Sequence, residues 1–429
     1  MTTAAPGPTR PAIAGDRRNM TVVKTLTYVM FAMFAMTTDS VGIIIPEVIR
    51  TFDLSLTAAG SFQYATMAGI AVSALLLGSL ADRLGRRRTI VIGLTLFAIA
   101  CFLFAAGNTF LFFALLMGLS GIAIGIFKTG ALALIGDLAS STRQHTSIMN
   151  MLEGFFGIGA IVGPAVLAGL LARGLSWTWL YVLAGTVCVG LIAVAWLVEY
   201  PEFRRSEASG RSGGTGRAMT NPFVLAFSAG VFLYVGIEAA VYVWMPTLLA
   251  GYTGPATLLA AYAVSVFFVL RAAGRFMGVW MLTRVPWQGV LALSSAAIFV
   301  LFAASVLGGR NWAVYLLPLS GLFMSVIYPT LNSKGISCLP KSEHGAGAGV
   351  ILFFTCVSAV VAPLAMGAVS DAFGRISYGF WLATAFAALL CVGTAWNWLA
   401  NPTRHLLAEL DRTEYRLEPG AGGVVASTK

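Results

Sequence analysis

Charged side chains interrupt several of the long apolar stretches in this 429-residue chain. A charge at the centre of a membrane helix costs about 2.5–3.5 kcal/mol, so each one is expected to have a partner or to face water. Some of these charges fall in the middle third of their stretch. Arg275 and Lys334 lie inside apolar stretches too, but they are not counted among the central charges. The central ones, which are the first candidates for function, are Asp39, Lys128, Glu153, Glu238 and Arg271.

The candidates divide into acids and bases with different chemistry. A carboxylate in a low-dielectric cavity holds a proton more tightly than it does in water, so Asp39, Glu238 and Glu153 are expected to couple proton movement. Lys128 and Arg271 suit an anionic substrate, which Arg271 can clamp bidentately, and Glu153 is expected to pair with one of these bases. The alternative is that the acids and bases only pair with one another and hold helices together.

A second group of candidates could contact a solute through rings, amides or an amine. A ring can stack on a sugar or close a pocket, and an amide can hydrogen-bond a substrate or a neighbouring helix. Packing against core or lipid is the alternative for each of them. Lys334 lies near the end of its stretch, where its amine either contacts substrate or extends to the membrane surface. The other members are Asn150, Tyr234, Trp244, Tyr328 and Asn332.

The composition indicates an all-α, polytopic membrane protein. Hydrophobic residues make up 58% of the chain and charged residues only 10%, with a mean hydropathy of +0.85, whereas about a quarter of a soluble domain is charged. The five cysteines are scattered and show neither metal nor disulfide spacing. Stretches long enough to span a membrane as helices cover residues 25–49, 57–80, 89–106, 109–136, 146–172, 177–198, 222–249, 256–281, 287–307, 312–337, 345–370 and 377–399.

These twelve spans fall into two groups of six. We expect a disordered tail at 1–20, a six-helix half at 21–198, a linker at 199–221, a second half at 222–399 and a polar tail at 400–429. Of the 27 Lys and Arg residues, 19 face the cytoplasm when both termini lie inside, and four lie in outer loops. This topology explains the net charge of +10 without a nucleic-acid partner. It predicts a multi-pass protein of the bacterial inner membrane, which we expect to be a monomer in the bilayer.

The two groups of spans repeat one another. Asp39 precedes Pro46 by seven residues, and Glu238 precedes Pro246 by eight, with the two prolines 200 positions apart. Duplicated halves of this kind place a substrate site near the middle of the membrane, between the halves. The first and seventh spans would then each bring one carboxylate to that site.

Residues 78–88, GSLADRLGRRR, form a short basic loop between the second and third spans. Its glycines allow two helix ends to approach closely, and Asp82 can cap a helix N-terminus or pair with an arginine. The loop resembles the signature loop of the major facilitator superfamily of transporters. That resemblance implies a twelve-helix fold and a cytoplasmic gate formed by Gly78, Asp82, Arg83, Gly85 and Arg86. A static basic anchor is the alternative.

Segments of the second half are similar to the fucose/galactose/glucose–proton symporter branch of that superfamily. They are YVGIE (234–238), GRFMG (274–278), MSVIYPT (324–330) and GAVSDAFG (367–374). The resemblance implies proton-coupled uptake of a sugar, with acids in helices 1 and 4. Lys128 stands at the helix 4 position that looks equivalent to the acid of the branch, which favours a sugar acid or other organic anion over a neutral hexose.

Two other functions stay open at this point. Residues 159–164, GAIVGP, partly resemble a helix 5 motif of proton-driven exporters, so export of drugs or metabolites is one alternative. A transporter-like sensor that binds solute without moving it is the other. We expect no enzyme, because no nucleophile elbow, phosphate loop or zinc spacing occurs, and His145, His344 and His405 are placed in loops or the tail. Neither a cofactor nor a metal is expected, since the proton gradient would supply the energy.

Overall fold

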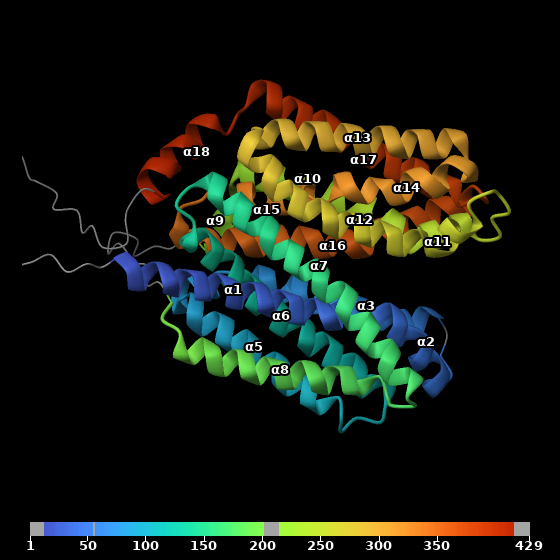
Figure 1. Cartoon of the computed structure of the whole chain (residues 1–429), viewed down its shortest axis with the longest axis horizontal. Helices are drawn as coiled ribbons and strands as arrows, with labels where there is room; N and C mark the ends of the chain where they lie inside the picture. The colour runs from blue at the N-terminus through green and yellow to red at the C-terminus, as the bar shows by residue number, and fades with distance from the viewer. Residues whose placement is uncertain (1–12, 55, 201–213, 416–429) are drawn as a thin grey trace, which may run out of the picture.

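The computed structural model describes residues 13–54, 56–200 and 214–415, without the side chains of 13–18 and 56–61. Every regular element in these ranges is a helix, as the apolar patterning predicts (Figure 1). The first half contains α1 (Ile13–Thr38), α2 (Val41–Phe52), α3 (Leu56–Leu77), α4 (Leu80–Leu84), α5 (Arg86–Leu103), α6 (Phe110–Leu138), α7 (Thr142–Ala172) and α8 (Thr178–Leu197). The second half contains α9 (Gly214–Thr220), α10 (Pro222–Ala239), α11 (Met245–Leu249), α12 (Thr257–Arg284), α13 (Trp287–Gly308), α14 (Arg310–Met324), α15 (Ile327–Ile336), α16 (His344–Ala372), α17 (Ser377–Ala400) and α18 (Arg404–Leu410).

The predicted spans all coincide with helices. Ten helical segments of the described chain are long and apolar enough to cross a membrane, and the two remaining predicted spans are α3 and α5. Side-chain caps fix where some of them begin. Thr109 accepts a hydrogen bond from the amide of Phe112 at the start of α6, and Asn221 accepts from the amide of Phe223 just before α10. The helix boundaries thus follow local sequence signals as well as hydrophobicity.

The two halves lie side by side, the first drawn from blue to green and the second from yellow to red (Figure 1). The start of α1 lies with α9 and α18 at one end of the molecule, which we call the terminal end. Helices α2 and α11 lie at the opposite, distal end. The halves meet mainly where α3 packs on α16 and where α7 packs on α12. Residues on these four helices therefore hold the halves together.

Glycines allow α3 and α16 to touch through their backbones. A Cβ atom added to Gly349 of α16 would overlap the carbonyl oxygen of Ala74 and crowd Gly78 just beyond α3. Only small residues permit so close an approach between membrane helices. Gly85, which separates α4 from α5, has a φ of 92°, a backbone conformation that favours glycine. Glycine is thus required at the two positions for different reasons, close helix packing at Gly78 and a positive φ at Gly85.

Three spans are interrupted near the middle of the protein. Residues Asp39–Ser40 separate α1 from α2, a π-helical turn at Ala240–Trp244 joins α10 to α11, and Ser325–Val326 separate α14 from α15. Glu238 lies just before the π-helical turn, and Tyr328 lies just after the third break. Interrupted helices and π-bulges concentrate at functional sites, because they expose backbone groups and redirect side chains.

The structure corrects the predicted linker and tails. Residues 214–220 of the expected linker form α9, where Ala218 is buried and Arg217 lies 3.1 Å from Glu343. The tail expected to be only polar contains α18, which buries Leu407. Helix α1 begins at Ile13, so residues 13–20 are helical rather than disordered. The rest of the expected linker and tails, at 1–12, 201–213 and 416–429, lies outside the described residues.

The placement of two histidines in loops is also wrong. His145 lies in the first turn of α7, which begins early because the Ser141 side chain accepts a hydrogen bond from the amide of Gln144. His344 is the first residue of α16. Both imidazoles are fully buried at the terminal end of the molecule.

Candidate functional site

Glu238 and Arg271 form an ion pair within the second half. Glu238 is the penultimate residue of α10, just before the π-helical turn, and Arg271 projects from α12. Their side chains are 8% and 16% exposed, so the pair is largely removed from water. The Arg271 guanidinium also lies 6.0 Å from the centre of the Phe268 ring, within range of a cation–π contact. One predicted coupling acid is therefore joined to one predicted anion contact.

A second ion pair joins the two halves. Arg275 of α12 lies 3.2 Å from the carboxylate of Glu153 on α7, and it donates to the Glu153 carbonyl oxygen at 2.7 Å. Only 2% of the Arg275 side chain is exposed. Glu153 therefore pairs with neither Lys128 nor Arg271, which corrects the expectation from sequence. Arg275 was missed as a site residue, although its spacing of four from Arg271 places both bases on one helix face.

Asp39 and Lys128 form no ion pair with the described residues. Asp39 is exposed in the break between α1 and α2, where it accepts a hydrogen bond from Thr38 at 3.0 Å. Lys128 of α6 instead lies 4.8 Å from the ring centre of Phe156 and 5.9 Å from that of Phe31. The charges of Lys128 and of the two α12 arginines all act on the Asp39 carboxylate. We call this set of acids and bases the charged cluster: Asp39, Lys128, Glu153, Glu238, Arg271 and Arg275.

Two tyrosines lie beside the charged cluster. Tyr234 of α10 is fully buried, and its ring centre is 6.2 Å from that of Tyr328 at the start of α15. The Tyr234 hydroxyl is buried without a hydrogen-bond partner among the described residues, and so is Nε of Arg271. Buried polar atoms are nearly always hydrogen-bonded in proteins, so these two donors are available to a polar ligand.

The remaining polar candidates contact neighbouring helices. Asn150 donates to the Thr330 hydroxyl of α15 at 3.4 Å, and the Trp244 indole donates to the Pro363 carbonyl of α16 at 3.2 Å. Asn332 is 1% exposed, and its carbonyl oxygen has no hydrogen-bond partner among the described residues. Helix-to-helix bonding, the alternative raised from the sequence, therefore describes Asn150 and Trp244 in this state.

Lys334 does not extend its amine to the membrane surface. It is 1% exposed, donates to the Thr142 carbonyl at 2.9 Å and lies 5.3 Å from the Trp287 ring centre. The amine is enclosed because α15 packs against the first turn of α7. This contact could not be predicted from the apolar stretch alone. Lys334 thus joins the two halves at the terminal end.

Arg86 joins three partners at the terminal end. Its guanidinium nitrogens lie 2.5 Å from the Asp82 carboxylate and 2.7 Å from that of Asp137, and donate to the Lys341 carbonyl at 2.5 Å. Asp82 also accepts from the amides of Gly345 and the next residue, both at 2.9 Å. Asp82 thus fulfils both roles expected of it, since it caps α16 and pairs with an arginine. The bonds to the Lys341 carbonyl and to the two α16 amides cross between the halves, and we call the whole set of contacts around Arg86 and Asp82 the terminal junction.

The fifth loop candidate, Arg83, is exposed on α4. Gly78 and Gly85 shape the loop, as described above, while Asp82 and Arg86 make hydrogen bonds to the second half. The 78–88 loop is therefore more than a basic anchor, because its acid and one arginine are built into the interface between the halves.

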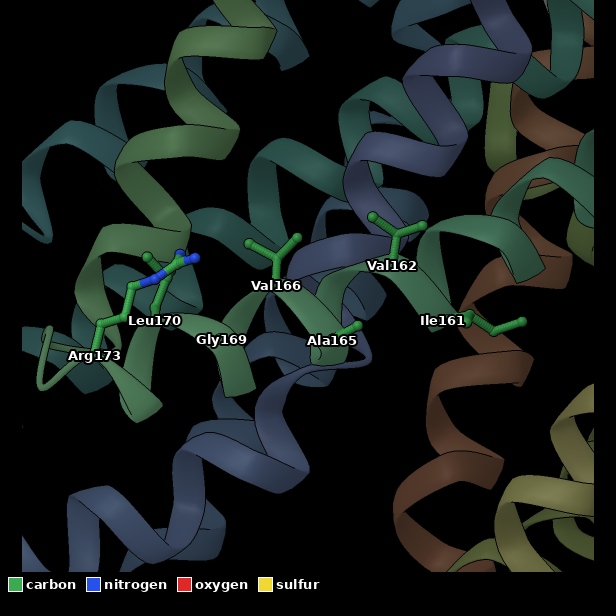
Figure 2. A pocket seen from close by; sticks show the side chains of 7 residues that line it. All are labelled: Ile161, Val162, Ala165, Val166, Gly169, Leu170 and Arg173. Atoms are coloured by element: carbon green, nitrogen blue, oxygen red, sulfur yellow. The ribbon is translucent and has the colours of Figure 1, made fainter.

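A hollow of about 460 Å³ lies along α7 toward the distal end (Figure 2). Gly157 of α7 faces Arg275 of α12, and the hollow begins one turn later at Ile161. Figure 2 shows its lining along one helix from Ile161 to Arg173. The lining residues are Ile161, Val162, Ala165, Val166, Gly169, Leu170 and Arg173. Beyond Gly157, α7 still packs against α1, but the face of α7 that lines the hollow is exposed.

Comparisons with known proteins agree with this architecture. The model of the Major Facilitator Superfamily matches residues 27–363. The chain is 25% identical over 373 residues to a glucose/galactose transporter of Brucella abortus, covering 84% of this chain and 90% of that protein. It is 25% identical over 410 residues to the L-fucose-proton symporter of Escherichia coli, covering 85% and 90% of the two chains.

Solved structures show the same fold. The fucose symporter FucP in the outward conformation superposes with a TM-score of 0.76 at 20% sequence identity, covering 88% of this chain and 99% of that one. The family match spans most of the described helices, and this family consists of transporters rather than enzymes. The twelve-helix, two-half prediction is therefore confirmed, and the chain is a multi-pass membrane protein that belongs to the Major Facilitator Superfamily.

Proposed function

We propose that this protein moves a small neutral sugar across the plasma membrane by proton-coupled alternating access. The observation that carries the proposal is the pairing of both α12 arginines with carboxylates, Arg271 with Glu238 and Arg275 with Glu153. The charged cluster then contains as many acids as bases. A neutral solute with many hydroxyl groups fits such a balanced site better than an anion does. The sugar-transporting relatives, at 25% identity, support the same class of substrate.

Sugar recognition would use the polar atoms that the protein leaves unbonded. The Tyr234 hydroxyl and Arg271 Nε can each donate to a sugar oxygen, and the Tyr328 ring lies beside them. A hydroxyl that fills these positions recovers the cost of burying a donor without a partner, which is about 1–3 kcal/mol for each group. Tyr234, Tyr328 and Arg271 are therefore our proposed substrate contacts.

Proton coupling would use the two acids that lie at helix interruptions. Asp39 is exposed and has no ion pair with a described residue, so a proton can reach it from the solvent. Glu238 is held by Arg271, and protonation of Glu238 would remove the charge that holds the arginine. Neutralising either acid leaves excess positive charge in the cluster, so protonation and the state of the arginines are linked.

Alternating access would use the terminal junction as a gate. The junction is closed, while the α7 residues that line the hollow are exposed at the distal end, which supports an outward-facing state. With both termini cytoplasmic, as the distribution of Lys and Arg indicates, the Arg86 contacts would form the cytoplasmic gate. The static-anchor alternative requires these contacts to persist while solute moves.

A second candidate substrate is a sugar acid or another organic anion. The observation that favours it is Lys128, whose amine lies over the Phe156 ring and forms no ion pair with a carboxylate of the described residues. A substrate carboxylate could pair with this amine in the way that an acid of the protein does not.

Thermal unfolding of the purified protein with and without ligands separates the two candidates. A ligand that binds only the folded state stabilises it by about 2.7 kcal/mol at a concentration of 100 times its Kd. We expect neutral hexoses to raise the melting temperature, and sugar acids and small carboxylates to have no effect. Stabilisation by the acids alone, lost in Lys128→Met but kept in the exposed-site control Arg284→Met, would transfer the proposal to an anion. Stabilisation only by lipophilic drugs would favour an exporter.

A further inference from the structure

The C-terminal segment folds back onto the terminal end of the molecule. Helix α18 and the π-helical turn that follows it, Asp411–Tyr415, come after the last span and bury Leu407 and Tyr415. Figure 1 shows α18 beside the terminal end, away from the parallel helices of its own half. No step of the proposed transport cycle uses this segment, and its contacts fall on both halves.

The first contact is between Asp411 and the start of α7 in the other half. The carboxylate accepts from the Thr142 amide at 2.7 Å and from the Thr142 hydroxyl at 3.2 Å. An acid at a helix N-terminus satisfies an amide that has no partner within the helix and interacts favourably with the helix dipole. The Thr142 carbonyl accepts from Lys334 of α15 at 2.9 Å. One residue of the first half is thus held from two directions by the second half and its tail.

The second contact is made by Tyr415. Its hydroxyl lies 3.2 Å from Oγ of Ser337 and 3.4 Å from Nδ1 of His145, and these two atoms are 2.8 Å from each other. His145 belongs to α7, whereas Ser337 caps the end of α15. Burial raises the pKa of the Tyr415 hydroxyl, so it stays neutral and able to donate a hydrogen bond.

The tail also contacts the connection between α15 and α16. The Lys341 amine lies 4.5 Å from the centre of the Tyr415 ring, and the Lys341 amide donates to Glu414 at 3.4 Å. The Lys341 carbonyl is the same group that accepts from Arg86 in the terminal junction. The tail therefore rests on a residue of the junction itself.

We propose that residues 411–415 form a latch that holds the terminal end closed by bonding to both halves at once. Separating the halves there pulls Thr142 and His145 away from Ser337 and Lys341, and one short segment cannot follow both sides. The Asp411 or Tyr415 contacts to α7 must therefore break whenever this end opens. The latch favours the state in which the distal end is open. The inference rests on alternating access in the proposed function but not on the identity of the substrate.

The reactivity of one native thiol reports opening of the terminal end. Cys338 follows Ser337 and is 3% exposed. In a protein whose other cysteines are replaced by serine, N-ethylmaleimide should modify Cys338 about tenfold faster in Asp411→Ala/Tyr415→Phe, because the hydrogen bonds to Thr142 and His145 across the closed end are lost. Thr413→Ala is the matched control, since among the described residues that exposed side chain is hydrogen-bonded only to the Glu409 carbonyl one turn earlier. In this variant Cys338 should be labelled at the same rate as in the protein with an unmodified tail.

A second thiol distinguishes opening from loss of structure. Ile161 lines the distal hollow and is 47% exposed, so Ile161→Cys in a protein without other cysteines reports that end. Loss of the latch should slow labelling there while labelling of Cys338 accelerates. Faster labelling at both positions would mean that the segment only stabilises the fold. An unchanged labelling rate at Cys338 would mean that the segment does not hold the terminal end closed. Either result overturns the proposal, whereas a failure to find the sugar leaves it standing.

Discussion

Arg86→Ala is expected to lower the free energy of unfolding by about 3–5 kcal/mol, the usual cost of removing one partner from a buried ionic contact. Arg86 serves the carboxylates of Asp82 and Asp137, whose side chains are only 2% and 3% exposed. Without the guanidinium, two acids of the same half stay buried near each other with no arginine between them. The Lys341 carbonyl also loses its donor. Thermal or denaturant unfolding of the purified protein measures the effect.

Two variants show whether the loss comes from the contacts of Arg86 or from charge alone. Arg88→Ala removes an exposed arginine of the same loop and should change stability by less than about 0.5 kcal/mol. Arg86→Lys keeps the charge but cannot bond to three partners, so its free energy of unfolding should lie between those of Arg86→Ala and the unmodified protein. Equal stability of the two alanine variants would show that the terminal junction contributes nothing to holding the halves together.

Glu238→Gln is expected to abolish accumulation of the substrate against its gradient and to destabilise the protein. The change removes a proton-binding group and leaves Arg271 without its carboxylate partner, although 16% of the Arg271 side chain is exposed and water can lessen the cost. A neutral pair in Glu238→Gln/Arg271→Gln should regain stability, with a coupling energy of about 0.5–3 kcal/mol in the double-mutant cycle. It should not regain accumulation, since the proton-binding group is still absent.

Uptake into vesicles with an imposed proton gradient and thermal unfolding measure these two effects separately. The same pair of measurements on Arg310→Gln provides a control, because Arg310 is exposed at the start of α14 and far along the chain from the charged cluster. Concentrative uptake by Glu238→Gln at the unmodified rate would remove this acid from the coupling mechanism. Additive energies in the cycle would show that the ion pair does not exist in the membrane.

The sequence predicted the positions of the helices and most members of the charged cluster. Hydrophobic runs set the helices, and charges stand out against them because an unpaired charge is costly in a membrane. Which acid meets which base could not be predicted, because that depends on how helices from the two halves rotate and pack. Arg275 and Glu153 are 122 positions apart, and nothing local distinguishes Arg275 from Arg271 as the partner.

The terminal end was the least predictable part. The hydropathy of α9 and α18 predicts polar connections. In the structure, however, α9 buries Ala218 and α18 buries Leu407. His145 and His344 sit close to loops in the sequence, but capping starts their helices early and the meeting of α7, α15 and α16 buries them. Such burial arises from contacts between the halves, which no pattern within one segment records.

The most direct test of the account is uptake of labelled D-glucose, D-galactose and L-fucose by the purified protein in proteoliposomes, with an acidic exterior and a neutral lumen. The account predicts that at least one neutral sugar accumulates above its external concentration, and that a protonophore abolishes the accumulation. Protein-free liposomes and Glu238→Gln provide the baselines. Accumulation of organic anions but none of these sugars, or sugar entry that ignores the proton gradient, would contradict the central claim.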